Sequence, residues 1–166
     1  MPSSSASVLV VTTGGTIDKV YFDAKSDYEV GESVVAELLH QAHVKHPFDV
    51  KSLMRKDSLE LDDGDMDLIH KTIQEAEHEK VIVTHGTDTM TETAAILSDI
   101  SGKTIVLTGA LAPARFAQSD ATFNVGMAFA AVQSLTEGVY IVMNGQVFNA
   151  SQVKKDRANN QFVSVS

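Results

Sequence analysis

Hydroxyl side chains beside glycines are the first feature of this sequence that could do chemistry. The stretch "TTGGTID", residues 12–18, follows the apolar run "VLVV" and places two adjacent glycines among three threonines. A glycine pair can be an ordinary tight turn, because glycine reaches positive φ without a steric penalty. It can also let backbone N–H groups approach a ligand closely. Taken alone, the stretch favours the ordinary turn.

A second stretch of this kind is "THGTDTMTET", in which Thr87 and Asp88 directly follow a glycine. A hydroxyl is inert as a nucleophile at neutral pH unless a base or an electrostatic field lowers the cost of losing its proton. A lysine can do this, and Lys155 and its neighbour Lys154 lie in the last polar segment. Thr16, at the tip of the first glycine turn, could then face a carbonyl carbon while backbone N–H groups stabilise the oxyanion.

Each of these features also has a purely structural interpretation. Thr89, three residues before Glu92, fits a capping box at the start of a helix. His85 is favoured as a packed, hydrogen-bonded residue over a catalytic base. The acidic stretch over residues 57–67 is typical of a solvated helix start, where the helix dipole favours negative charge. The two lysines could be ordinary surface charges.

Short apolar runs predict the strands that must position these residues. Because they do not alternate apolar with polar residues, they indicate strands buried on both faces. Helical periodicity separates them, and this alternation predicts a parallel sheet with right-handed crossovers. The fold class is therefore α/β, a three-layer arrangement around a mostly parallel, flavodoxin- or Rossmann-like sheet. The predicted strands are 8–11, 48–54, 81–84, 104–108 and 139–143, and the predicted helices 33–42, 62–79, 90–98 and 123–135.

The polar segments after these strands are expected to meet, because ligands bind at the carboxyl ends of the strands in an open parallel sheet. Threonine, serine, aspartate and lysine residues then converge on one rim. No histidine pair or carboxylate cluster has metal-ligand spacing, so we expect neither a metal nor a cofactor. Residues 18–31 form either a lid or a hairpin. The segment after Met143 indicates a hairpin and a short closing strand.

Composition restricts the class of protein further. At 166 residues with 43% hydrophobic residues, the chain is expected to form one domain over residues 1–166. Its net charge of -9 and lack of a basic run argue against nucleic-acid and membrane partners. The absence of cysteine excludes disulfides and thiolate chemistry. The N-terminus has no basic region and no long apolar run, which indicates a cytoplasmic protein.

Four blocks of the sequence occur in a characteristic order: "TTGGTI", "THGTDTMTETA", "GALAPAR...DATFN" and "VMNGQV...VKKD". Together they closely resemble the bacterial-type L-asparaginase family, and the resemblance covers nearly all of the chain. It implies the fold of the asparaginase N-terminal domain. It also implies hydrolysis of L-asparagine to L-aspartate and ammonia by a homodimer or higher oligomer, without a cofactor. Glutamine is a conceivable weak substrate, since one methylene gives only ~1–3 kcal/mol of discrimination.

The resemblance also implies catalytic roles for the matching residues. Thr16 falls on the family's nucleophile, and Tyr28 on the tyrosine that activates it. Thr87 would position the attacked amide or water, and Asp88 would bind the substrate's α-amino group. Lys155 would assist Thr87 as proton acceptor or as a source of positive field, with a register slip of one residue left open.

Substrate-binding residues follow from the same resemblance. Asp57 and Ser58 match the pair that holds the substrate's α-carboxylate. Free asparagine is a zwitterion, so selectivity needs a donor for its carboxylate and a carboxylate for its ammonium, as Ser58 and Asp88 would provide. Gly15 and the HGTDT stretch would supply N–H donors to an acyl-enzyme on the threonine. The backbone at Ala110 would take up the side-chain amide.

Two departures from the family pattern are visible. Family members are commonly about twice this length, and a second, smaller domain donates an acidic residue near the substrate's amino group. Losing that charge-assisted contact costs ~1.5–3 kcal/mol, so we expect weak or high-KM activity. In addition, Leu59 and Glu60 stand where the family usually has Gln or Ser followed by Asp.

Two further functions stay open as alternatives. A non-catalytic amino-acid-binding or partner-binding module could have kept the cleft. A role within a tRNA-dependent amidotransferase is disfavoured by the acidic charge and the missing accessory domain. A nucleotide-binding interpretation of "TTGGTIDK" fails because neither a P-loop nor GxGxxG is present.

Overall fold

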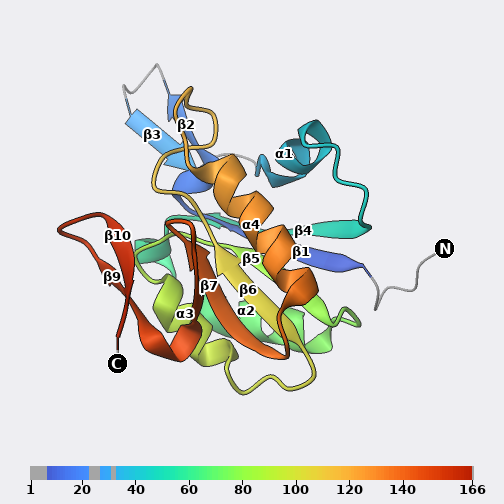
Figure 1. Cartoon of the computed structure of the whole chain (residues 1–166). Helices are drawn as coiled ribbons and strands as arrows, with labels where there is room; N and C mark the ends of the chain where they lie inside the picture. The colour runs from blue at the N-terminus through green and yellow to red at the C-terminus, as the bar shows by residue number, and fades with distance from the viewer. Residues whose placement is uncertain (1–6, 23–26, 31–32, 166) are drawn as a thin grey trace.

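A twisted, mostly parallel sheet forms the centre of the protein (Figure 1). The computed structural model describes residues 7–22, 27–30 and 33–165. The strand order is β4-β1-β5-β6-β7-β8, in which the first five are parallel and β8 joins as an antiparallel edge. The strands are β1 (Val8–Gly14), β4 (Phe48–Lys56), β5 (Lys80–Thr84), β6 (Thr104–Thr108), β7 (Gly138–Met143) and β8 (Gln146–Asn149).

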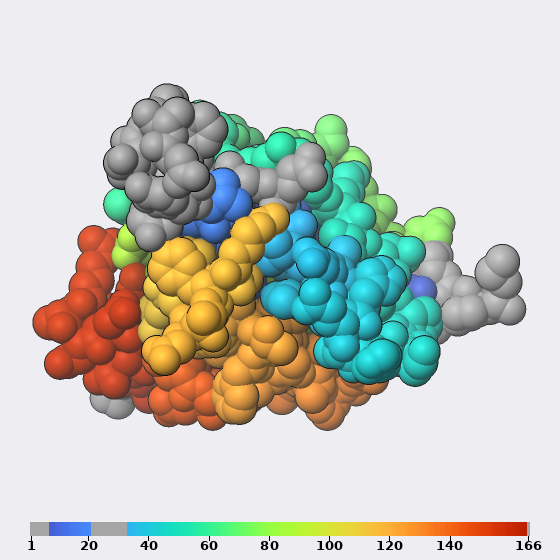
Figure 2. Space-filling view, turned by 90° about the horizontal axis from the view of Figure 1, so that it is seen from above, coloured from blue at the N-terminus to red at the C-terminus, as the bar shows by residue number. Residues whose placement is uncertain are grey.

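Side chains along β1 alternate between two cores, one on each face of the sheet, and each core is covered by a pair of helices. Val8 and Val10 pack into a core with helices α1 (Val35–Gln41) and α4 (Ala121–Ser134). Leu9 and Val11 face the other way, into a core with α2 (Asp63–Glu75) and α3 (Met90–Leu97). Figure 2 shows α1 and α4 side by side on one face. The predicted three-layer α/β fold is therefore confirmed.

The strand order creates a crevice between β1 and β5. The connection from β1 leads outward to the edge strand β4, whereas the chain after β5 continues in the opposite direction to β6. This is the flavodoxin-like order, in which the two neighbouring connections diverge and leave space at the carboxyl ends of the strands. Thr12 pairs in register with Thr84, the last residue of β5, and β1 continues to Gly14 beyond this level.

Helix α2 ends four residues before its predicted limit. The prediction of a helix to residue 79 is wrong, because the chain is extended at Ala76. The Lys103 ammonium donates hydrogen bonds to the carbonyls of Ala76 and His78, which holds this segment in place before β5. At its start, α2 carries a capping box between Asp62 and Asp65.

Two small antiparallel hairpins flank the carboxyl end of the sheet. Strands β2 (Lys19–Phe22) and β3 (Asp27–Val30) resolve the choice between a lid and a hairpin in favour of a hairpin. Strands β9 (Val153–Asp156) and β10 (Gln161–Ser164) form the second, so the closing strand pairs with β9 rather than with the main sheet. Among the described residues, no helix is long and apolar enough to cross a membrane.

Candidate active site

A tight turn at the end of β1 presents the first predicted site residue. Gly15 has φ +87°, and its N–H donates to the carbonyl of Lys56 at 2.9 Å. The prediction that the Gly15 N–H is a donor for the oxyanion is therefore wrong, because this N–H is already paired. The next three residues form a 3-10 turn, Thr16–Asp18, in which Ile17 and Asp18 are buried and Thr16 is only half-buried. The turn therefore exposes the threonine at the rim while its neighbours anchor it.

Glycines allow the loops after β1, β4 and β5 to touch. A Cβ on Gly15 would lie 2.5 Å from the backbone N of Gly86, and a Cβ on Gly86 would lie 2.5 Å from the Cβ of Ser58. The hydroxyl of Thr89 donates to the carbonyl of Ser58 at 3.0 Å. The predicted capping box at Thr89 is wrong, since its side chain makes no cap to α3 and joins two loops of the site instead.

The Gly86 contact gives a testable prediction. We expect Gly86→Ala to lower the free energy of unfolding by about 1–3 kcal/mol, because the new methyl group would overlap Ser58. The matched control is Gly126→Ala, on the exposed side of α4, where an added Cβ meets nothing within 4 Å. That change should stabilise the helix by about 0.5–1 kcal/mol. Urea denaturation checks both, and equal effects would contradict the packing argument.

Thr87, Asp88 and Lys155 form a hydrogen-bonded cluster across the rim. The Lys155 ammonium donates to the hydroxyl of Thr87 at 2.7 Å and to the carboxylate of Asp88 at 2.8 Å. Only 11% of the lysine side chain is exposed, against 31% for the aspartate. The hydrogen bond from Lys155 lowers the pKa of the Asp88 carboxyl. The cluster thus joins a hydroxyl, a carboxylate and an ammonium at the end of β5.

The lysine of this cluster lies on a strand rather than in a loop. Lys155 belongs to β9, where its neighbour Lys154 points outward and is exposed. The contacts therefore select Lys155 over Lys154. The sequence did not single out Arg157, whose guanidinium donates to the backbone carbonyl of Asp88 at 3.3 Å and lies 3.7 Å from its carboxylate. Arg157 lies in the turn directly after β9, which ends at Asp156, so strand alternation gave no signal for this contact.

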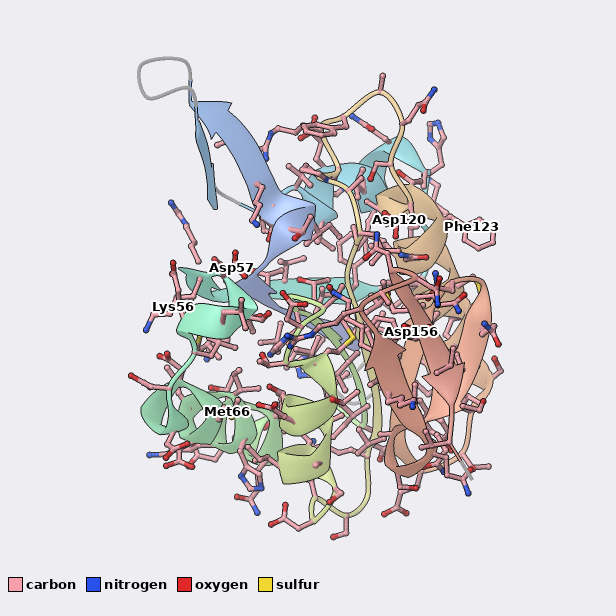
Figure 3. The ribbon with its side chains drawn as sticks, turned by 90° about the vertical axis from the view of Figure 1, so that its left-hand side faces the viewer. Lys56, Asp57, Met66, Asp120, Phe123 and Asp156 are labelled. Atoms are coloured by element: carbon pink, nitrogen blue, oxygen red, sulfur yellow. The ribbon has the colours of Figure 1, made fainter. Side chains whose placement is uncertain are left out.

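Asp57 and Ser58 lie where β4 ends, on the opposite side of the site from β9. The Asp57 carboxylate forms an ion pair of 3.0 Å with Lys19. Ser58 is 2% exposed, and its hydroxyl has no hydrogen-bond partner among the residues described. Figure 3 views this rim, with Asp57 on one side and Asp156 of β9 on the other. A buried hydroxyl without a partner is a free donor for a ligand oxygen.

His85 is a structural residue, as its position before the loop predicted. It is fully buried, and burial lowers the pKa of its imidazole. Its Nδ1 lies 2.7 Å from the Gly86 carbonyl and its Nε2 lies 2.8 Å from the Thr93 hydroxyl. Since a carbonyl only accepts, Nδ1 carries the proton and Nε2 accepts from the threonine. The neutral ring therefore fixes the backbone just before Thr87.

Ala110 lies after β6, in a loop held by Asp120. The alanine is 1% exposed and packs into the α1–α4 core. The Asp120 carboxylate accepts N–H bonds from Leu111 at 3.0 Å and Ala112 at 3.1 Å. It also accepts from the amide of Asn124 at 2.9 Å. The sequence did not predict this network, although an aspartate before a helix was a signal for it.

Tyr28 is placed only through its backbone. It lies in β3, in register with Tyr21 of β2, at the hairpin that follows the Thr16 turn. Its side chain lies outside the part of the chain that the structure describes, so its predicted contact with Thr16 stays a prediction.

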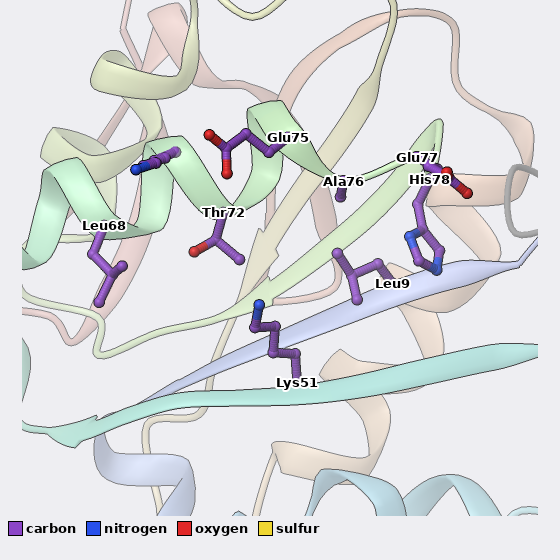
Figure 4. Close-up of a pocket in the computed structure, with 9 residues that line it drawn as sticks. Leu9, Lys51, Leu68, Thr72, Glu75, Ala76, Glu77 and His78 are labelled. Atoms are coloured by element: carbon purple, nitrogen blue, oxygen red, sulfur yellow. The ribbon is translucent and has the colours of Figure 1, made fainter.

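The groove in Figure 4 is separate from this rim. Its volume is about 470 Å³, and it lies between α2 and strands β1 and β4. None of the predicted site residues lines it. By contrast, a groove of about 530 Å³ is lined by residues of β9, including Lys155, and by Arg157. Within the described ranges, no group of three or more His, Asp or Glu side chains could hold a metal ion.

Comparison with known proteins assigns the chain to a family. Residues 7–165 match the family described as "Asparaginase, N-terminal". The chain belongs to this family. It is 30% identical to L-asparaginase 2 of Escherichia coli K12 over 162 residues, which are 89% of this chain and 46% of that protein. It is 32% identical to a glutamyl-tRNA(Gln) amidotransferase polypeptide of Pyrococcus abyssi over 154 residues, 84% of this chain and 34% of that protein.

A solved structure agrees with the assignment. The crystal structure of a probable cytoplasmic L-asparaginase from Campylobacter jejuni superposes with a TM-score of 0.78 at 27% identity, covering 96% of this chain and 51% of that one. This asparaginase-family chain therefore spans about half the length of the L-asparaginases it matches.

Proposed function

We propose that this asparaginase-family protein hydrolyses L-asparagine to L-aspartate and ammonia through an acyl-enzyme on Thr16. The observation that carries the proposal is the contact of Lys155 with both Thr87 and Asp88. The ammonium is mostly buried, and it meets the Thr87 hydroxyl beside the turn that leaves a second hydroxyl, that of Thr16, half-buried. Such an arrangement suits nucleophilic attack on a polarised carbonyl group.

Substrate recognition in this proposal uses the two ends of the zwitterion. The free hydroxyl of Ser58 donates to the α-carboxylate, with Asp57 beside it. The Asp88 carboxylate, whose pKa is lowered by Lys155, is ionised at neutral pH and accepts from the α-ammonium. Because Lys155 and Arg157 already share Asp88, the ammonium competes with two cations. We therefore propose weak binding of asparagine and a high KM.

The chemistry proceeds in two steps. The Thr16 oxygen attacks the side-chain amide carbon, which the backbone at Ala110 helps to hold, and N–H groups of the HGTDT stretch stabilise the oxyanion. The amide nitrogen takes up a proton and leaves as ammonia, so that the threonine carries an aspartyl ester. Water, oriented by Thr87, then attacks this ester and releases L-aspartate. Tyr28 is the proposed acceptor of the Thr16 proton, and Lys155 supplies the positive field at Thr87.

The proposal is tested by the products of the wild-type protein. Incubation with L-asparagine should release ammonia and aspartate in equal amounts, faster than with L-glutamine. Added hydroxylamine should divert the ester to aspartyl hydroxamate, which is diagnostic of an acyl-enzyme. If titration calorimetry finds that aspartate binds while no ammonia forms, the protein is an amino-acid-binding module and the proposed activity is wrong. Light scattering in the same buffer tests the proposed homodimer or higher oligomer.

A further inference from the structure

A buried carboxylate lies two residues beyond the proposed nucleophile. Asp18 is 1% exposed and closes the 3-10 turn that begins at Thr16. One of its oxygens accepts the N–H of Val34 at 3.1 Å, across sixteen residues of sequence. Its carboxylate also accepts a hydrogen bond from the Ser33 side chain. The β2–β3 hairpin therefore begins after Asp18 and ends before the residues that bind it.

The partners of Asp18 fit the ionised carboxylate. A carboxylate only accepts hydrogen bonds, and both partners are donors. The Ser33 oxygen itself accepts the N–H of Val35 at 3.3 Å, so its hydroxyl proton is directed to Asp18. The charged group that faces Asp18 from the loop after β6 is Arg115, which favours the anion. Burial outweighs the opposing effects of Val34, Ser33 and Arg115 and raises the pKa of Asp18 to about 6.

Other contacts make the turn rigid enough to transmit a change at Asp18. The Asp18 N–H donates to the carbonyl of Gly15 at 3.1 Å. The carbonyl of Ile17 accepts the N–H of Ala114 at 3.0 Å, and the Ile17 side chain is fully buried. Thr16 is thus the one residue of the turn that its surroundings do not bury, and it is held through residues on either side.

We propose that Asp18 is a positioning residue for Thr16, whose carboxylate ties the nucleophile turn to the start of α1 and whose charge sets how firmly the turn is held. Its catalytic consequence rests on the proposed function of Thr16, whereas the tie itself does not. Protonation of the Asp18 carboxylate removes one acceptor site next to the Val34 N–H and the Ser33 hydroxyl, and it thereby weakens the tie. The active form of the turn is therefore the one with Asp18 ionised.

An NMR titration of the whole chain tests the tie without any activity. The backbone amide signals of Val34 and Thr16 should shift together with a midpoint near pH 6. Asp18→Asn, which keeps an oxygen for Val34 but cannot ionise, should remove both shifts. Ser33→Ala should move the midpoint to higher pH, because the anion loses a donor. The control, Asp63→Asn on the exposed start of α2, should leave the titration unchanged.

Stability gives a second measurement with a definite sign. The native state keeps the Asp18 proton up to about pH 6, whereas the unfolded chain loses it near pH 3.8. The native state therefore binds more protons between these values, and the free energy of unfolding falls as the pH rises through this window. Urea denaturation should show this decline in the wild type and a smaller one in Asp18→Asn.

Three results would overturn the proposal: Val34 does not titrate between pH 5 and 7, Val34 titrates but Thr16 does not, or Asp18→Asn keeps both shifts. In the wild type, kcat with L-asparagine should fall below pH 6. In Asp18→Asn, kcat should be low and independent of pH. An unchanged acid limb in the variant would also contradict the proposal. If the wild type releases no ammonia, the proposed function fails, while the amide titration still decides the role of Asp18.

Discussion

Replacing Thr16 by alanine should lower kcat for L-asparagine by at least about a thousandfold, because no other oxygen takes its place at the tip of the turn. The half-buried side chain contributes little to packing, so the unfolding midpoint should stay close to that of the wild type. Hydroxylamine should no longer trap aspartyl hydroxamate. Ammonia release and mass spectrometry of the trapped ester measure the two effects.

Two controls separate the chemistry of Thr16 from its packing. Thr16→Ser keeps the hydroxyl and should retain activity within about tenfold of the wild type. Thr122→Ala removes a threonine hydroxyl from the exposed face of α4 and should leave kcat unchanged. Equal rates for the wild type and Thr16→Ala would rule out the assignment of the nucleophile.

Lys155→Met should lower kcat by about a hundredfold or more, the range expected when a group that transfers or stabilises a proton is removed. Methionine nearly preserves the length of the side chain but takes both hydrogen bonds from Thr87 and Asp88. The pKa of Asp88 should then rise toward its usual value, because its largest stabilising contact is lost. An NMR titration of the Asp88 carboxyl and steady-state kinetics check the two consequences.

The neighbouring lysine provides the matched control for this prediction. Lys154 lies on the same strand with its side chain exposed, so Lys154→Met changes the net charge equally without touching the cluster. Its kcat and KM should equal those of the wild type. If both variants lose activity to the same extent, the effect arises from net charge and the role proposed for Lys155 is wrong.

The layers of the fold follow from local patterns of sequence. The run from Val8 to Val11 is apolar at every position, and the structure buries its two faces in two different cores. The predicted helix ends were less accurate than the predicted layers, because tertiary contacts decide where a helix ends. Lys103, far along the chain, holds the carbonyls beyond α2, and no pattern within the helix indicates this.

The candidate site was predictable to the level of which loops meet, because parallel strands end at one edge. The contacts between individual side chains could not be predicted in this way. The resemblance pointed to Lys155 but left a slip of one residue to Lys154 open, since only the position of β9 decides which of two adjacent side chains faces Thr87 and Asp88. Nor could it reveal that the Thr89 hydroxyl bonds to Ser58 instead of capping its helix.

Residue types and their order thus determined the α/β class, the converging polar loops and the resemblance to asparaginases. They did so because burial and turn formation are encoded locally. The tertiary structure decided the burial of Asp18, the contacts of Lys155 with Thr87 and Asp88, and the position of the Ser58 hydroxyl, which has no hydrogen-bond partner among the described residues. Each of these depends on the distance between segments remote in sequence, and such distances exist only after the chain has packed.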